Sequence, residues 1–170
     1  MSKLKTLIIF LFLQTSLFAQ VSDIQKAEVM FIYNFARLIQ WPDNYREGDF
    51  TIAVMGSSDM LSELKNYTKQ KKVGFQAVEV KRFKTPEQIS KCHILFVSNS
   101  KSNLLPTIKE KLSGQSTLLI SEKKGSIENG AAINFLVSGN KLKFELKESN
   151  ATDHGLKLSA RLKDMAAKVL

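Results

Sequence analysis

Cysteine, proline and glycine are scarce in this chain of 170 residues, which has one Cys, three Pro and eight Gly. A single cysteine cannot form an intramolecular disulfide, so a disulfide-stapled miniprotein is excluded and the fold must depend on its core. The low glycine and proline content excludes a collagen-like fibre, and 44% hydrophobic residues exclude a disordered tail. A chain of this length buries roughly two thirds of its unfolded surface, which is typical of one globular domain.

Arginine is scarce among the basic residues. Four of the 25 Lys and Arg residues are arginines, and the other 21 are lysines spread along the chain. The net charge of +9 is compatible with nucleic-acid binding. Proteins that recognise bases or phosphates, however, favour arginine forks or clustered basic stripes. The spread of the lysines therefore argues against a nucleic-acid partner.

No hydrophobic run is long enough to cross a membrane. The N-terminal run, residues 7–13, has seven residues, whereas a spanning helix needs about twenty. Lys3 and Lys5 precede this run and Ala19 follows it, which is the order of a secretory signal peptide. We predict that residues 1–19 are a cleaved signal peptide and that residues 20–170 form a single exported domain. Its net charge falls from +9 to +7, because two lysines and no acid are removed.

The spacing of apolar residues predicts alternating strands and helices. Steps of three and four residues predict a helix over residues 22–39, with Ser22 and Gln25 as a capping box. Further helices are expected over residues 59–69 and 104–112, with a short helical connector over residues 86–91. Strands are expected over residues 50–55, around 78–80, over 93–97 and over 117–121. This alternation predicts an α/β fold: a single three-layer domain with a mostly parallel sheet and flanking helices.

The last third of the chain has a different pattern. Apolar segments at residues 132–137 and 142–146 flank Ser138-Gly139-Asn140, which predicts an antiparallel hairpin with a three-residue turn at one edge of the sheet. We predict a closing helix capped by Asn150, in which Gly155 delays the regular part by a turn. One apolar face of that helix would carry Leu158, Leu162, Met165 and Val169.

Groups that could perform catalysis are few. Cys92 and His93 are neighbours in a predicted strand, so their side chains point to opposite faces and cannot form a dyad. A buried, inert Cys92 is favoured over a redox-active or intermolecular thiol. His154 beside Asp153 indicates a solvated surface pair. The turn at residues 56–58 could hold an anion, but one glycine is typical of an ordinary tight turn rather than a nucleotide loop.

Metal ligands and cofactor motifs are also missing from the sequence. No Cys, His or carboxylate residues recur at metal-ligand spacing, and no dinucleotide fingerprint, P-loop or nucleophile elbow occurs. We therefore expect no metal, no cofactor and no enzymatic activity, with an enzyme of unrecognised type as the least favoured alternative.

Several segments together resemble the YfiR-like family of exported bacterial proteins. The match begins at Lys26-Ala27, runs through residues 31–37 to Trp41-Pro42, and continues with residues 50–56 and 92–98. It is completed by Gly130, Asn134-Phe135, Phe144-Glu145, Asn150-Ala151, Gly155-Leu156 and residues 159–162.

This resemblance implies a periplasmic α/β protein, often a homodimer, that regulates without catalysis. It implies binding to the periplasmic sensor domain of an inner-membrane diguanylate cyclase, which represses the cyclase and lowers cyclic di-GMP and biofilm formation. A sensor histidine kinase or another envelope receptor is an alternative partner, and an OmpA-like outer-membrane lipoprotein can sequester the regulator. Many relatives carry a cysteine in the first strand, where this chain has Ala53, so redox control by a disulfide is disfavoured here.

Six residues are candidates for binding a partner or a ligand, although core packing is the simpler interpretation of the aromatic ones. An alternative function is a small-ligand-binding module, in which the loop after the first strand and Arg161 hold an anionic metabolite. The six candidates are Asn34, Phe35, Trp41, Glu145, Asn150 and Arg161.

Overall fold

The computed structural model describes residues 23–170. The predicted signal peptide (residues 1–19) and Ser22 of the predicted capping box lie outside the described residues. The first helix occupies residues 23–38 of the described part, close to the range that the sequence predicts. No helix within residues 23–170 has the length and apolar character that a membrane span requires.

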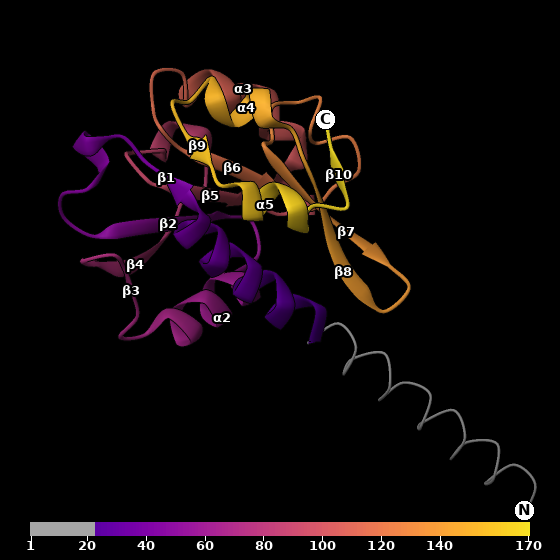
Figure 1. The fold of residues 1–170 in the computed structure, drawn as a ribbon, viewed down its shortest axis with the longest axis horizontal. Coiled ribbons are helices and arrows are strands. Elements are labelled where there is room, and N and C mark those ends of the chain that lie inside the picture. The colour runs from indigo at the N-terminus through magenta and orange to yellow at the C-terminus, as the bar shows by residue number, and fades with distance from the viewer. Residues whose placement is uncertain (1–22) are drawn as a thin grey trace, which may run out of the picture.

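An eight-stranded sheet runs through residues 23–170 in the order β10-β8-β7-β6-β5-β2-β4-β3 (Figure 1). Two-residue strands form its edges: β3 (Lys72–Val73) beside β4, and β10 (Lys168–Val169) beside β8. A separate antiparallel ladder joins β1 (Ile39–Gln40) to β9 (Lys157–Leu158). The longer strands of the sheet are β2 (Phe50–Met55), β4 (Gln76–Arg82), β5 (Ile94–Val97), β6 (Leu118–Ser121), β7 (Ile133–Ser138) and β8 (Lys141–Leu146).

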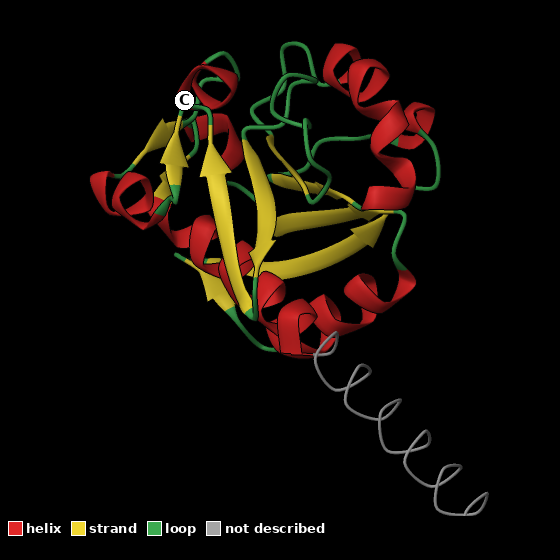
Figure 2. Cartoon of the chain, turned by 90° about the vertical axis from the view of Figure 1, so that its right-hand side faces the viewer, coloured by secondary structure: helices red, strands yellow, loops and turns green. Residues whose placement is uncertain are grey.

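Helices cover both faces of the sheet, which confirms the predicted three-layer α/β fold. Strands β4, β2, β5, β6 and β7 run parallel to one another, whereas β3 and β8 pair antiparallel at the two ends of this series. Side chains alternate along β2, so Ile52 packs in one core cluster with the first helix and α2 (Ser58–Thr68). Ala53 packs in the other cluster with α3 (Leu105–Lys111). Figure 2 shows the strands gathered at the centre of the domain with helices around them.

The strand order reverses between β2 and β5. The chain passes from β2 through α2 to β4 on one side, and then returns to β5 on the other side of β2. Gly56, which follows β2, has a φ of +113°, and a Cβ at this position would lie 1.9 Å from Ser98 Oγ. Only glycine fits this close approach. Ser57 then caps α2 by accepting a 3.1 Å hydrogen bond from the Met60 amide, as expected for a tight strand-to-helix turn.

The aromatic face of the first helix packs on the hairpin strands. Phe35 is fully buried, and its ring centroid lies 4.9 Å from that of Phe144 and 6.0 Å from that of Phe135. Phe31 adds a third contact at 5.7 Å from Phe35. Burying an aromatic side chain removes a large apolar area from water, so this cluster joins the helix firmly to β7 and β8.

The antiparallel hairpin of β7 and β8 confirms the prediction for the C-terminal third, but its turn is shorter. Ser138 pairs with Lys141, so the turn consists of Gly139 and Asn140 rather than three residues. Gly139 has a φ of +59°, the conformation that two-residue hairpin turns require at this position. Strand β10 pairs with β8 and lies outside the hairpin at this edge.

The prediction of a single closing helix is wrong. The segment instead forms α4 (Glu148–Thr152), β9, α5 (Ala160–Met165) and β10. Gly155 follows α4 with a φ of +70°, which prevents helical continuation. Asn150 lies within α4 and not at its cap. Apolar residues that share a helical period thus belong to separate elements, because pairing with β1 and β8 outweighs helical continuity.

Short 3₁₀ turns replace part of the predicted helical connections. The connector predicted at residues 86–91 is a turn over Pro86–Gln88. Another turn, Asn99–Leu104, comes directly before α3, so the helix predicted from residue 104 begins one residue later. A third turn, Asp43–Tyr45, follows the first helix and leads to β2.

Candidate functional site

Two of the six candidate residues meet in one surface pocket. Asn34, Arg37 and Leu38 of the first helix line it on one side, and Arg161 and Met165 of α5 on the other. The cavity has a volume of about 200 Å³. Asn34 and Arg161 are far apart in the sequence, so the pocket depends on how the C-terminal segment returns to the first helix.

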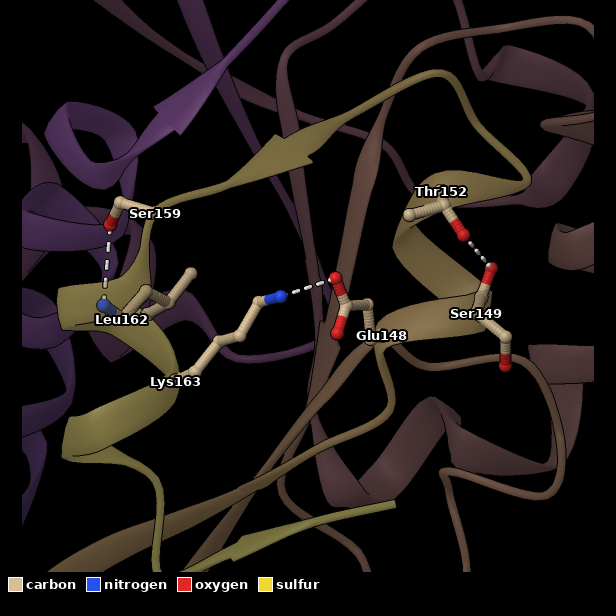
Figure 3. Close-up of polar contacts among 6 residues, drawn as sticks. All are labelled: Glu148, Ser149, Thr152, Ser159, Leu162 and Lys163. Atoms are coloured by element: carbon tan, nitrogen blue, oxygen red, sulfur yellow. Dashed lines mark hydrogen bonds and ion pairs between the residues drawn. The ribbon is translucent and has the colours of Figure 1, made fainter.

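The β1–β9 ladder and a serine cap place α5 against the first helix. Ile39 pairs with Leu158, and the Ser159 amide donates a 3.0 Å hydrogen bond to the Leu38 carbonyl. The Ser159 hydroxyl accepts a 3.2 Å hydrogen bond from the Leu162 amide, which caps α5 (Figure 3). Leu162 is fully buried in the core cluster of the first helix. Because Arg161 lies between these two anchored residues, its backbone position is fixed.

An ion pair ties α5 to α4. Lys163 Nζ lies 2.5 Å from Glu148 Oε1, and both side chains are partly exposed (Figure 3). The Thr152 hydroxyl donates a 3.2 Å hydrogen bond to the Ser149 carbonyl within α4. An ion pair of this exposure contributes at most about 1 kcal/mol, so the cap and the ladder are the main constraints on α5.

The pocket is electrostatically positive. Arg37 and Arg161 are exposed, and within residues 23–170 neither guanidinium has a carboxylate within ion-pair distance. Guanidinium groups bind carboxylates and phosphates through paired hydrogen bonds, and an asparagine amide can donate a further one. The lining contains no nucleophile and no general base, so this arrangement is suited to binding rather than to catalysis.

Two other candidates are part of the folded interior. Phe35 belongs to the aromatic cluster described above, and we assign it to packing. Trp41 is 6% exposed and packs edge-on against Phe50 at a centroid distance of 5.1 Å. Its ring lines two surface grooves, and its Nε1 is buried without a hydrogen-bond partner among the described residues. Trp41 is therefore mainly a packing residue.

The side chains of Glu145 and Asn150 form hydrogen bonds within the fold and lie outside the pocket. Asn134 Nδ2 donates a 3.1 Å hydrogen bond to Glu145 Oε1 across the hairpin. Asn150 Nδ2 donates to the carbonyls of Ile127 and Ala131, both at 2.9 Å, and so fixes the loop between β6 and β7. The pocket at Arg161 includes neither side chain.

Cys92 and His93 point to opposite faces, as predicted, although both lie just before β5, which begins at Ile94. Cys92 is fully buried in the α3 cluster, and burial raises the pKa of its thiol to about 12. The His93 ring stacks on Phe50 at 4.1 Å. Its Nδ1 accepts a 3.0 Å hydrogen bond from the Thr51 amide and its Nε2 donates to the Tyr45 carbonyl at 2.7 Å. Burial lowers the pKa of His93, so the ring is a neutral structural group.

His154 and the residues after β2 have different surroundings from those expected. His154 is half-buried, and its Nδ1 lies 2.8 Å from the Gln115 carbonyl, so it is not a fully solvated partner of Asp153. The loop of residues 56–58 does not line the pocket at Arg161. Within residues 23–170 there is no group of three His, Cys, Asp or Glu side chains that could hold a metal ion.

Sequence analysis missed one buried acid. Glu28 of the first helix is 6% exposed, and its pKa is raised to about 8 by burial, by repulsion from Glu122 and by a hydrogen bond to that side chain. Glu122 follows β6 and accepts a 2.8 Å hydrogen bond from the Asn99 amide. The only sequence signal is an acid on a helix rich in apolar residues, which is not specific. Arg37, Leu38 and Met165 of the pocket were also missed, because the pairing of β1 with β9 was not predicted.

Comparisons with known proteins identify the family and a similar fold. The model of the YfiR/HmsC-like family matches residues 25–167. Among solved structures, the chain is similar to an ABC domain from Streptococcus pneumonia in complex with L-Trp, with a TM-score of 0.54 and 14% identity. That alignment covers 71% of this chain and 55% of the other, so the chain spans about half the length of that protein. At this identity the likeness concerns the fold alone. Curated proteins give no match.

Proposed function

Because this chain belongs to the YfiR/HmsC-like family, whose known role is periplasmic and regulatory rather than enzymatic, we propose that it binds the periplasmic sensor domain of an inner-membrane signalling protein. The proposed partner is a diguanylate cyclase that this binding represses, so that cyclic di-GMP and biofilm formation fall. An OmpA-like outer-membrane lipoprotein would relieve the repression by sequestering the regulator.

The observation that carries this proposal is the family match, which covers residues 25–167 and thus nearly all of the described domain. The site supports it in two ways. The two arginines of the pocket offer positive charge to an acidic surface, which favours rapid association. The buried titratable groups are held in structural roles, Cys92 by core packing and His93 by two hydrogen bonds to the backbone.

Export to the periplasm is part of the proposal. We propose that residues 1–19 are removed as a signal peptide and that residues 20–170 are the mature protein. N-terminal sequencing of the protein recovered from the periplasmic fraction should begin at Gln20. Recovery of the intact chain in the cytoplasm would contradict this part of the proposal.

The experiment that tests the partner is a pull-down from detergent-solubilised envelopes with the tagged protein. We expect it to retain a membrane protein that has a periplasmic sensor domain and a cytoplasmic cyclase domain. Arg161→Glu should reduce retention, because it reverses a charge at the pocket, whereas Arg82→Glu at the exposed end of β4 should not. Retention of no membrane sensor would overturn the proposal. Retention of a sensor kinase instead of a cyclase would change the identity of the proposed partner but would keep the proposed regulatory role.

Deleting the gene gives an independent test of the direction of regulation. If the protein represses a cyclase, cellular cyclic di-GMP should rise in the deletion strain and return to its original level on complementation. An unchanged level would contradict cyclase repression even if the pull-down retains a membrane partner.

The two pocket arginines, which have no ion-pair partner within residues 23–170, also favour a second function, a small-ligand-binding module. The pocket of about 200 Å³ suits an anionic group held by Arg37 and Arg161. A thermal-shift screen with carboxylates and phosphates tests this, since a ligand at a hundred times its Kd adds about 2.7 kcal/mol of stability. Arg161→Ala should abolish the shift, and Arg82→Ala should preserve it. A panel without any shift would exclude this alternative for the compounds tested.

A further inference from the structure

Two methionines of the described domain lie at the surface, and one of them lines the Arg161 pocket. Met165 is 38% exposed and Met30 is 49% exposed. The other methionines within residues 23–170, Met55 and Met60, are buried in the two core clusters. A thioether at the surface is open to oxidants, whereas packing protects a buried one. Met165 therefore places an oxidisable side chain in the wall of the pocket.

The backbone is anchored on both sides of Met165, the last residue of α5. Leu162, three residues earlier, is fully buried in the core cluster of the first helix. The Ala167 amide, two residues later, donates a 2.8 Å hydrogen bond to the Phe144 carbonyl of β8. These two contacts hold Met165 at the pocket although α5 is a short helix.

Met165 and Arg161 are neighbours on one face of α5. Residues four apart in a helix lie one above the other, and both side chains line the same cavity of about 200 Å³. Arg37 lines that cavity from the first helix. Met165 therefore shares a small space with two guanidinium groups. Within residues 23–170, neither of them has a carboxylate at ion-pair distance.

Oxidation changes the chemistry of Met165 at the point where these arginines lie. Hydrogen peroxide transfers one oxygen atom to the thioether: the O–O bond breaks, an S–O bond forms, the sulfur loses two electrons and water leaves. A thioether is a weak hydrogen-bond acceptor, whereas the sulfoxide oxygen is polar. A guanidinium group has five donors and no acceptor. A sulfoxide at residue 165 is thus a suitable partner for the donors of Arg161.

We propose that Met165 is a reversible oxidation site that controls the Arg161 pocket. In the reduced protein, Arg37 and Arg161 have a thioether beside them and their donors bind an anionic group. In the oxidised protein, the sulfoxide oxygen accepts hydrogen bonds from these donors and competes with the anion. A methionine sulfoxide reductase reverses the change, because it removes the oxygen as water while a dithiol is oxidised to a disulfide. This inference rests on the Arg161 pocket as the binding site of the proposed function.

Peptide mass spectrometry after treatment with hydrogen peroxide tests the modification. We expect one added oxygen atom on Met30 and one on Met165, with Met55 and Met60 reacting only in denaturant. In the Met30→Leu variant the surface sulfoxide forms at Met165 alone. Met165→Leu is the matched control, in which it forms at Met30 alone. A Met165 side chain that stays reduced while Met30 reacts would overturn the proposal.

NMR of the arginine Nε–H groups tests the contact without any ligand or partner. Oxidation of the Met30→Leu variant should shift the Arg161 signal, which Arg161→Lys identifies by its disappearance. Treatment with the two epimer-specific methionine sulfoxide reductases and dithiothreitol should return the signal to its original position. The oxidised Met165→Leu variant should show no shift. An Arg161 signal that does not respond, or that responds equally in both variants, would overturn the proposal.

Calorimetric titration with inorganic phosphate tests the effect on binding. We expect the oxidised Met30→Leu variant to bind phosphate about tenfold more weakly than its reduced form, the effect of losing one charge-assisted hydrogen bond. Peroxide should not change the affinity of Met165→Leu. Equal affinities of the oxidised and reduced Met30→Leu variant would overturn the control of the pocket. A reduced protein that binds no phosphate would overturn the pocket as an anion site, a failure that the NMR experiment distinguishes from failure of the sulfoxide contact.

Discussion

Glu28 of the first helix shares a side-chain hydrogen bond with Glu122, the residue that follows β6. Glu28 lies on the buried side of the first helix, and Glu122 lies at the carboxyl end of β6. Glu28 is the buried partner, so it holds the proton of the pair. This contact makes the attachment of the first helix sensitive to pH.

We predict that the contribution of Glu28 to stability falls as the pH rises from about 5 to 8. The pKa of Glu28 is about 8 in the folded protein and 4.5 in a solvated glutamate, so the folded state retains a proton that the unfolded state releases in this range. Glu28→Gln keeps the hydrogen-bonding capacity without the titration, and it should gain on the order of 3 kcal/mol over the wild type between pH 5 and 8. Urea denaturation at several pH values measures this. Glu110→Gln, at an exposed position of α3, should follow the wild type throughout.

Protonation of the buried His93 should reduce stability at acidic pH. Burial lowers the pKa of His93 below the usual 6.5. Below pH 6.5 the unfolded state therefore binds a proton at His93 more readily than the folded state does. The contribution of His93 to stability should therefore fall as the pH drops from 6.5 toward the folded pKa, opposite in sign to the contribution of Glu28. His93→Gln should flatten this acidic decline, whereas His154→Gln should leave it in place. If the acidic decline in stability persists in His93→Gln, another titratable group causes it.

Ser159→Ala should destabilise α5 by about 1 kcal/mol, because the Leu162 amide loses the hydroxyl that caps the helix. Ser159→Asp, which keeps a capping oxygen, should retain most of the stability that Ser159→Ala loses. Chemical denaturation measures the stability, and the thermal-shift response to an anion that binds the wild type measures the pocket. Loss of the response in Ser159→Ala and its return in Ser159→Asp would show that the cap positions Arg161. A response equal to that of the wild type would contradict it.

Cys92 should be inert in the folded protein. Its thiol is fully buried, and a pKa of about 12 leaves almost no thiolate at neutral pH. Labelling with a thiol-specific disulfide reagent should be undetectable under native conditions and should reach one thiol per chain in denaturant. Since the chain has no other cysteine, the signal reports Cys92 alone. Rapid labelling of the native protein would contradict this prediction and would support a redox role for Cys92.

The central part of the fold was predictable from local patterns. Strand β2 and helix α2 carry a buried apolar run, a glycine turn and a serine cap in sequence, and each signal agrees with the next. The closing segment was not predictable, because Leu158 and Leu162 have helical spacing and yet lie in β9 and α5. Their placement depends on pairing with Ile39, a residue distant in the sequence, and no local pattern records such a contact.

The candidate site was predictable only in part, for a related reason. Asn34 and Phe35 are neighbours on one helix, and a rotation of about 100° between them takes one side chain to the pocket and the other to the core. The sequence marks both as unusual but does not fix which faces outward. The choice depends on the tertiary contacts of that helix with β7, β8 and α5.

The pairing of Ile39 with Leu158 constrains the order in which the fold can form. It joins a residue near the C-terminus to an element made much earlier, and closing so long a loop has a high entropic cost. A chain that emerges N-terminus first must hold its first helix without the cover of α5 until almost all residues are present. Formation of the Arg161 pocket therefore has to wait until α5 has been synthesised.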